Sequence, residues 1–131
     1  MFELTSINNY LSNKKHGVQQ LYHAGKLLVL SNYENGMHEG QFISWNLNGK
    51  IAYKLNLHND KYHGECLAWH DNGNLLYDYK FKNGRKHELC RSWNTDGVLI
   101  EDDYYNYGVN SSDVEVHDII SMSWRDTLLI E

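Results

Sequence analysis

The sequence has no apolar run that approaches the roughly 18 residues a membrane-spanning helix requires. Its first residues lack the basic start and long apolar region of a secretory signal. Positive charge is also scarce, since 12 Lys and Arg stand against 17 Asp and Glu, for a formal net charge of -5. Nucleic acids and anionic lipids are bound by clustered Lys and Arg. We therefore expect a soluble, cytoplasmic protein that binds no nucleic acid and for which a membrane role is disfavoured.

The residue patterns of common catalytic sites are missing too. The candidate nucleophilic serines have no glycine-rich elbow around them: Ser44, Ser92 and Ser123. Glu101, Asp102 and Asp103 are adjacent in sequence, so along a strand they alternate between faces instead of converging as an acid/base pair. The glycines recur with predicted turns and have no helix start behind them, which excludes a phosphate-binding loop. We predict no enzymatic activity and no cofactor.

What the sequence does contain is a repeat of 24 residues. One glycine column has equal spacings of 24: Gly25, Gly49, Gly73 and Gly97. A second column keeps the same spacing: Gly36, Asp60, Gly84 and Gly108. An aromatic column has steps of 23, 24 and 24: Tyr22, Trp45, Trp69 and Trp93. Several columns in phase at such a period indicate a repeat architecture.

Each repeat has the pattern of a β-hairpin. In the segment 64–70, Leu67 and Trp69 share one face and Cys66 and Ala68 the other, which is the period of a strand. Residues 71–73 supply turn chemistry, and the next segment is again of period two. Its apolar side chains share one face: Leu75, Tyr77, Tyr79 and Phe81. A second turn at 83–84 leads into the next unit.

The fold predicted from these units is all-β, a single-layer twisted antiparallel meander of hairpin repeats in one domain. An N-terminal half repeat covers 1–16, four repeats cover 17–39, 40–63, 64–87 and 88–108, and a C-terminal segment covers 109–131. That last segment fits either strands, by the parity of its apolar residues, or a helix that begins with a capping box. In both cases we expect it to cap the open end of the array.

The cysteines and histidines recur with the repeat. Cys66 and Cys90 are 24 residues apart, so we expect them on equivalent strands about 9.5 Å apart. That distance exceeds the roughly 7 Å limit for a disulfide, which predicts two free thiols and a reducing compartment. His63 and His87 share a column with His16, and the same spacing is too wide for one zinc ion. We expect these histidines to shield turns and predict no metal site.

Aromatic residues provide the candidate binding surface. We expect Trp45, Trp69 and Trp93 to form a ladder along the sheet, flanked by aromatic rings of the partner strands: Tyr53, Tyr77, Tyr79, Phe81 and Tyr105. A single-layer sheet has no second layer to cover such a face, and exposed aromatic patches often mark interfaces. The alternative is that curvature and the C-terminal segment cover the rings as core. The acidic stretch Glu101, Asp102 and Asp103 beside Trp93 is the predicted place for charge complementarity.

These residues resemble the MORN repeats, and more closely the MORN-variant repeat of bacterial proteins of the YwqK type and of giant-virus proteins. The resemblance rests on NGK at 48–50, YHG at 62–64, the step from NG at 83–84 to His87, and the aromatic residue five positions after each unit start. Asp60, Glu88 and the segment 109–131 depart from the pattern. The resemblance implies a protein-interaction scaffold, with antitoxin-like members and some membrane association; a viral origin would place it in the host cytoplasm or the virion.

The sequence therefore predicts a non-enzymatic scaffold that binds another protein through its extended sheet. Two alternatives remain open. One is an antitoxin, immunity protein or inhibitor that neutralises an effector. The other is a structural or virion component that assembles through the sheet, for which a homo-oligomer is expected.

Overall fold

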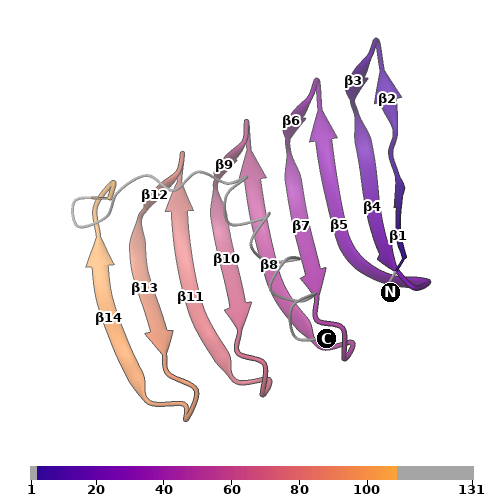
Figure 1. Cartoon of the computed structure of the whole chain (residues 1–131). Helices are drawn as coiled ribbons and strands as arrows, with labels where there is room; N and C mark the ends of the chain where they lie inside the picture. The colour runs from indigo at the N-terminus through magenta and orange to yellow at the C-terminus, as the bar shows by residue number, and fades with distance from the viewer. Residues whose placement is uncertain (1–2, 109–131) are drawn as a thin grey trace.

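The computed structural model describes residues 3–108, and each regular element in this range is a β-strand. Figure 1 shows the strands side by side in one curved sheet that follows the chain from the N-terminal end to the last hairpin. The strands that form its main path are β1 (Leu4–Ile7), β4 (Gly17–His23), β5 (Lys26–Glu34), β7 (Gly40–Trp45), β8 (Ile51–His58), β10 (Gly64–Trp69), β11 (Leu75–Lys82), β13 (Glu88–Trp93) and β14 (Leu99–Tyr105). The predicted segment 109–131 lies outside the described residues.

Five short strands extend the hairpins at one end of the long strands: β2 (Tyr10–Leu11), β3 (Lys14–Lys15), β6 (Met37–His38), β9 (Lys61–Tyr62) and β12 (Arg85–Lys86). β6, β9 and β12 pair with β5, β8 and β11, and β2 pairs with β3. All neighbours pair antiparallel, so the predicted meander of hairpins is confirmed. Between residues 3 and 108 the structure has no helix that could cross a membrane.

The turns at this end of the strands are two-residue hairpin turns with positive φ at both positions. Asn83 and Gly84 have φ of 50° and 87°, and Lys82 pairs directly with Arg85 across them. Two positive φ angles define the type I′ turn, whose twist matches that of the flanking strands and which favours Asn-Gly. The same conformation recurs at 12–13, 35–36 and 59–60. Local turn chemistry thus fixes the register of each hairpin.

The strand register determines which side chains share a face. Tyr77 lies directly opposite Ala68 on β10 and Ser92 on β13. Tyr53 lies opposite Ser44 and Ala68 in the same way. Residues directly opposite each other in a sheet lie on the same face. The inner face therefore alternates bulky tyrosines with small side chains from strand to strand.

This register shows which residues lie beside the predicted aromatic side chains. Tyrosines of the second strands lie beside the small residues, because Tyr79 pairs with Cys66 and not with Leu67. The register shifts between Ala68 and Trp69, so that Trp69 lies opposite Leu75 at the far end of the hairpin. The regular pairing thus ends before the tryptophan, and the prediction that the tryptophan ladder and the tyrosines form one surface stays a prediction.

The core lies on this inner face. One buried cluster contains Leu28, Val29, Phe42, Leu55, Leu57, Tyr62, Cys66 and Phe81, and Tyr53, Tyr77 and Tyr79 pack against it. Phe42 and Leu55 lie opposite each other and are both 0% exposed. Burying one such side chain contributes about 1.5–3 kcal/mol. Packing among neighbouring hairpins on one face therefore stabilises the 12-stranded sheet.

Candidate functional site

Most of the predicted aromatic site belongs to the core. Tyr105 is 4% exposed, and Tyr77 and Tyr79 stack with ring centroids 4.4 Å apart at an angle of 14°. Burial raises the pKa of Tyr77 well above its ordinary value, with smaller contributions from neighbouring groups such as Tyr62. These rings offer little surface to a partner. The tryptophans Trp45, Trp69 and Trp93 are half-buried at the strand ends, and their binding role stays a prediction.

The predicted acidic stretch is divided between the two faces. Asp102 lies opposite Arg91 on the outer face, where its Oδ1 accepts a hydrogen bond from Nε at 3.1 Å. Asp103 is exposed opposite Cys90. Glu101 points to the inner face, in the row that carries Tyr53 and Tyr77 in the preceding hairpins. The expected alternation along the strand is confirmed, and it leaves two of the three carboxylates available at the surface.

Four side chains hold the Glu101 carboxylate. It accepts hydrogen bonds from the Tyr79 hydroxyl at 2.5 Å and the Tyr105 hydroxyl at 2.7 Å. Lys86 Nζ donates at 3.2 Å and the Ser92 hydroxyl at 3.4 Å. The side chains of Lys86 and Glu101 are 17% and 20% exposed. Lys86 Nζ also lies 4.2 Å from the ring centroid of Tyr79 and 5.0 Å from that of Tyr105.

The electrostatics of this Glu101 cluster keep the carboxylate ionised. Burial raises the pKa of Glu101, but hydrogen bonds from Tyr79, Tyr105 and Lys86 outweigh it and lower the pKa below 4.5. Burial and the hydrogen bond to Glu101 raise the pKa of Tyr79 to about 12. An ionised carboxylate that already accepts four hydrogen bonds is poorly suited to general acid or base work near neutral pH. The cluster is an internal ion pair that fixes the last hairpin.

Exposed apolar side chains gather on that same hairpin. Tyr104 is 71% exposed and Ile100 64% exposed, and both share the outer face of β14 with Asp102. Val98, Leu99 and Tyr107 are exposed nearby. Sequence reasoning missed these residues. The sequence did contain a signal for an exposed aromatic residue here. Tyr104 is equivalent in the repeat to three polar residues of the outer face: Asn32, Asn56 and Lys80.

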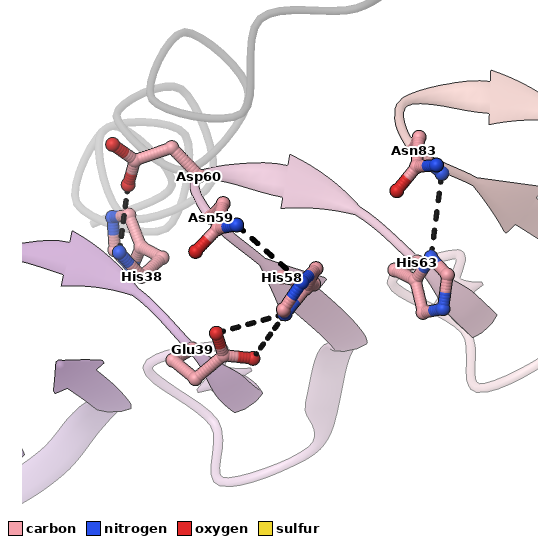
Figure 2. Close-up of polar contacts among 7 residues, drawn as sticks. All are labelled: His38, Glu39, His58, Asn59, Asp60, His63 and Asn83. Carbon is pink, nitrogen blue, oxygen red and sulfur yellow. Dashed lines mark hydrogen bonds and ion pairs between the residues drawn. The ribbon is translucent and has the colours of Figure 1, made fainter.

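Histidines and acidic residues link neighbouring hairpins near the two-residue turns (Figure 2). His63 Nδ1 accepts a hydrogen bond from the Asn83 amide at 3.3 Å, and His87 Nδ1 accepts one from the Tyr107 amide at 3.2 Å. Each of these histidines therefore holds the turn of the following hairpin, which confirms the predicted turn-shielding role for this pair. In the part of the chain that the structure describes, no group of three His, Cys, Asp or Glu is placed to hold a metal.

Two residues that break the repeat pattern in this region, one in a glycine column and one in the histidine column, make polar contacts of their own. Asp60 adopts a φ of 65°, and its Oδ1 accepts a hydrogen bond from the His38 amide at 2.7 Å. This bond offsets the strain of a non-glycine residue in the left-handed region. Glu39, in the His63 column, instead contacts His58 Nδ1 with both carboxylate oxygens at 2.9 Å (Figure 2). Polar contacts between repeats thus continue where the repeat motif is broken.

Both cysteines are free and buried on the inner face. Cys66 Sγ lies 3.8 Å from the Asn56 carbonyl oxygen, and Cys90 Sγ lies 3.5 Å from that of Lys80. Burial raises the pKa of the Cys66 thiol to about 12. A thiol with so little thiolate is a poor nucleophile. The expected free thiols are confirmed, and both act as small core residues on the inner face.

Taken together, the fold and this geometry define a repeat protein in which consecutive β-hairpins share one sheet and one inner core. Residues 62–83 match the family model of the MORN repeat variant. Residues 62–83 therefore carry a MORN repeat variant, as the sequence resemblance predicted, while the closer relation to YwqK-type and giant-virus proteins stays a prediction. MORN repeats are generally protein- or membrane-interaction modules and are not an enzymatic family. Comparisons with curated proteins and with solved structures gave no match.

Proposed function

We propose that this protein is a non-enzymatic scaffold that binds another protein through the outer surface of its last hairpin, β13 and β14. The observation that carries the proposal is the exposure of Ile100 and Tyr104 beside Asp102. Monomeric proteins seldom leave neighbouring large apolar side chains in water without a use for them. The free, buried cysteines support a reducing compartment such as the cytoplasm.

The chemistry of this surface indicates the kind of partner. A tyrosine offers a large apolar ring with one polar atom, and such residues frequently anchor protein interfaces. Asp102 adds negative charge to the same outer face, so a partner with basic side chains around an apolar patch fits best. Asp102 is paired with Arg91 but stays 46% exposed, whereas Asp103 lies opposite Cys90 on the inner face.

The test is an affinity capture from the native host with three forms of the protein. The wild type is compared with the double variant Ile100→Ala and Tyr104→Ala. Met37→Ala is the matched control, because Met37 is also an exposed apolar residue, at 39%, but lies far from the last hairpin. A specific partner should be retained by the wild type and the control and lost from the double variant. Equal retention by all three forms would refute this location of the interface.

A second candidate function is structural self-assembly. It is favoured by exposed apolar residues at the opposite end of the sheet. Leu4, Ile7, Tyr10, Leu11 and Val18 are all exposed at the N-terminal strands. Exposed strands at both ends provide edges through which copies could associate. Light scattering after size-exclusion chromatography over a concentration series separates the two functions. Growth in mass with concentration, removed by Tyr104→Ala, favours assembly; a monomer that holds one foreign protein one to one favours an inhibitor or antitoxin.

A further inference from the structure

The two ends of the sheet carry the same lysine–tyrosine pair. Lys15 and Lys86 occupy equivalent positions, because each follows a two-residue type I′ turn by two residues and pairs with the residue two before that turn. Tyr33 and Tyr105 are likewise equivalent, each opposite the first residue of a first strand. Lys15 Nζ lies 5.1 Å from the Tyr33 ring centroid, and Lys86 Nζ lies 5.0 Å from that of Tyr105.

At the C-terminal end this pair surrounds a carboxylate, that of Glu101. The position equivalent to Glu101 in the first hairpin is Val29, which cannot supply one. Ser31 likewise stands where the following hairpins carry the bulkier Leu55 and Tyr79. The smaller Val29 and Ser31 leave a hollow of about 250 Å³ on the inner face, lined by residues of β1, β3, β4, β5, β6 and β7.

The walls of this hollow combine an apolar floor with buried polar groups. Leu21, Val29 and Phe42 form the floor. Gln19 is 4% exposed, and both ends of its amide are bonded to the backbone of Asn9, which fixes its position. His38, 7% exposed, is 3.0 Å from the Tyr33 hydroxyl through Nε2.

The charge of the hollow differs in sign from that of the whole protein. Lys15 is a lining residue, and among residues 3–108 no Asp or Glu lines the hollow. The chain as a whole has a formal net charge of -5. Within the described residues this partly buried ammonium group shares the hollow with no acidic side chain, which favours an anion, and hydroxyls such as those of Ser31 and Tyr33 can donate to the same anion.

We propose that this hollow binds a small organic carboxylate with a compact apolar body. The ligand carboxylate takes the place that the Glu101 carboxylate holds at the other end, beside Lys15 and the Ser31 hydroxyl. Its apolar body lies on Leu21, Val29 and Phe42. Drug-sized ligands occupy roughly 300–1,000 Å³, so the hollow suits a single-ring acid rather than a larger ligand. This site is separate from the protein-binding hairpin proposed above.

Titration with benzoate, followed by amide chemical shifts in NMR spectra of the full chain, tests this proposal. Benzamide is the neutral ligand of the same shape. We expect benzoate to bind at least about tenfold more tightly than benzamide, with shift changes centred on β4 and β5. Equal affinities for the two probes would overturn the anion preference, and the absence of shift changes in this region would overturn the site.

Two variants locate the binding. Lys15→Gln should weaken benzoate binding about tenfold, whereas Lys14→Gln, a neighbouring and exposed lysine, should leave it unchanged. Ser31→Leu introduces the residue that the next hairpin holds at Leu55, so it should fill the hollow and abolish binding while the amide spectrum remains folded. If benzoate still binds Ser31→Leu, or binds Lys15→Gln as tightly as wild type, the proposal is wrong.

Discussion

Replacing Glu101 by alanine should destabilise the protein more than any other single carboxylate change in the last hairpin. The substitution removes the acceptor of four hydrogen bonds and leaves Lys86 as a charge that is only 17% exposed. Hydrogen bonds to a charged group contribute about 1.5–3 kcal/mol each, and breaking a buried ion pair costs about 3–5 kcal/mol. Since the pair retains some solvent contact and the two costs overlap, we expect a loss of about 3 kcal/mol at pH 7.

Urea unfolding followed by circular dichroism measures this loss, and hydrogen exchange locates it. Faster exchange should be concentrated in β13 and β14. Asp102→Ala is the matched control, because Asp102 is 46% exposed and its ion pair with Arg91 should contribute less than about 0.5 kcal/mol. A double variant, Lys86→Met with Glu101→Leu, removes both charges together and should recover most of the stability, since no unpaired charge remains.

The pH dependence gives an independent test of the same cluster. Because the folded-state pKa of Glu101 is lowered below 4.5, its contribution is fully present above the unfolded-state value. It is lost as the pH falls from about 4.5 through the lower folded-state pKa. The stability difference between wild type and Glu101→Ala should therefore shrink in acid. A difference below about 1 kcal/mol at pH 7, or one that stays constant down to pH 3, would refute the reasoning.

Three further substitutions or treatments test the packing and the turns. Asp60→Ala should lower the free energy of unfolding, measured in urea, by about 2 kcal/mol, because it removes the acceptor for the His38 amide and leaves alanine at a φ of 65°. Asp60→Asn should lower the free energy of unfolding much less. Ala68→Leu should cost about 1–3 kcal/mol by overpacking a 0% exposed position between tyrosine strands, and no loss would contradict the inner-face register. Cys66 and Cys90 should resist a thiol reagent at pH 8 in the folded protein and react at once in denaturant; rapid native labelling would contradict their burial.

The sequence predicted the hairpins because the features that fix them are local. Asn83 and Gly84 are the residues that a two-residue type I′ turn favours, and the structure has that turn there. The alternation of Cys66 and Ala68 with Leu67 likewise required only the period of one strand. Each of these inferences uses residues close together in the chain, so the three-dimensional arrangement could not overturn it.

The faces of neighbouring strands could not be matched in this way. Period two groups Tyr77 with Tyr79, but it does not say whether their neighbours across the hairpin are Leu67 or the small Ala68 and Cys66. The register decides this, and a change of one residue reverses the answer. Here the register shift between Ala68 and Trp69 ends the regular pairing before the tryptophan. The sizes of the side chains indicate the register here, because large tyrosines fit best beside small residues on the neighbouring strands.

The candidate sites lie where the repeat pattern changes at the ends of the sheet. An interior hairpin has a neighbour on each side, and the column of Lys15 and Lys86 holds His38 and Tyr62 there, both buried. Toward the two ends of the described residues the same column carries a lysine, at Lys15 and at Lys86. The chain supplies a carboxylate to Lys86 through Glu101 but leaves Lys15 beside a hollow. Columns that remain constant therefore build the sheet, whereas Ser31, Glu101 and Tyr104 give its two ends different chemistry, so a ligand or partner should distinguish one end from the other.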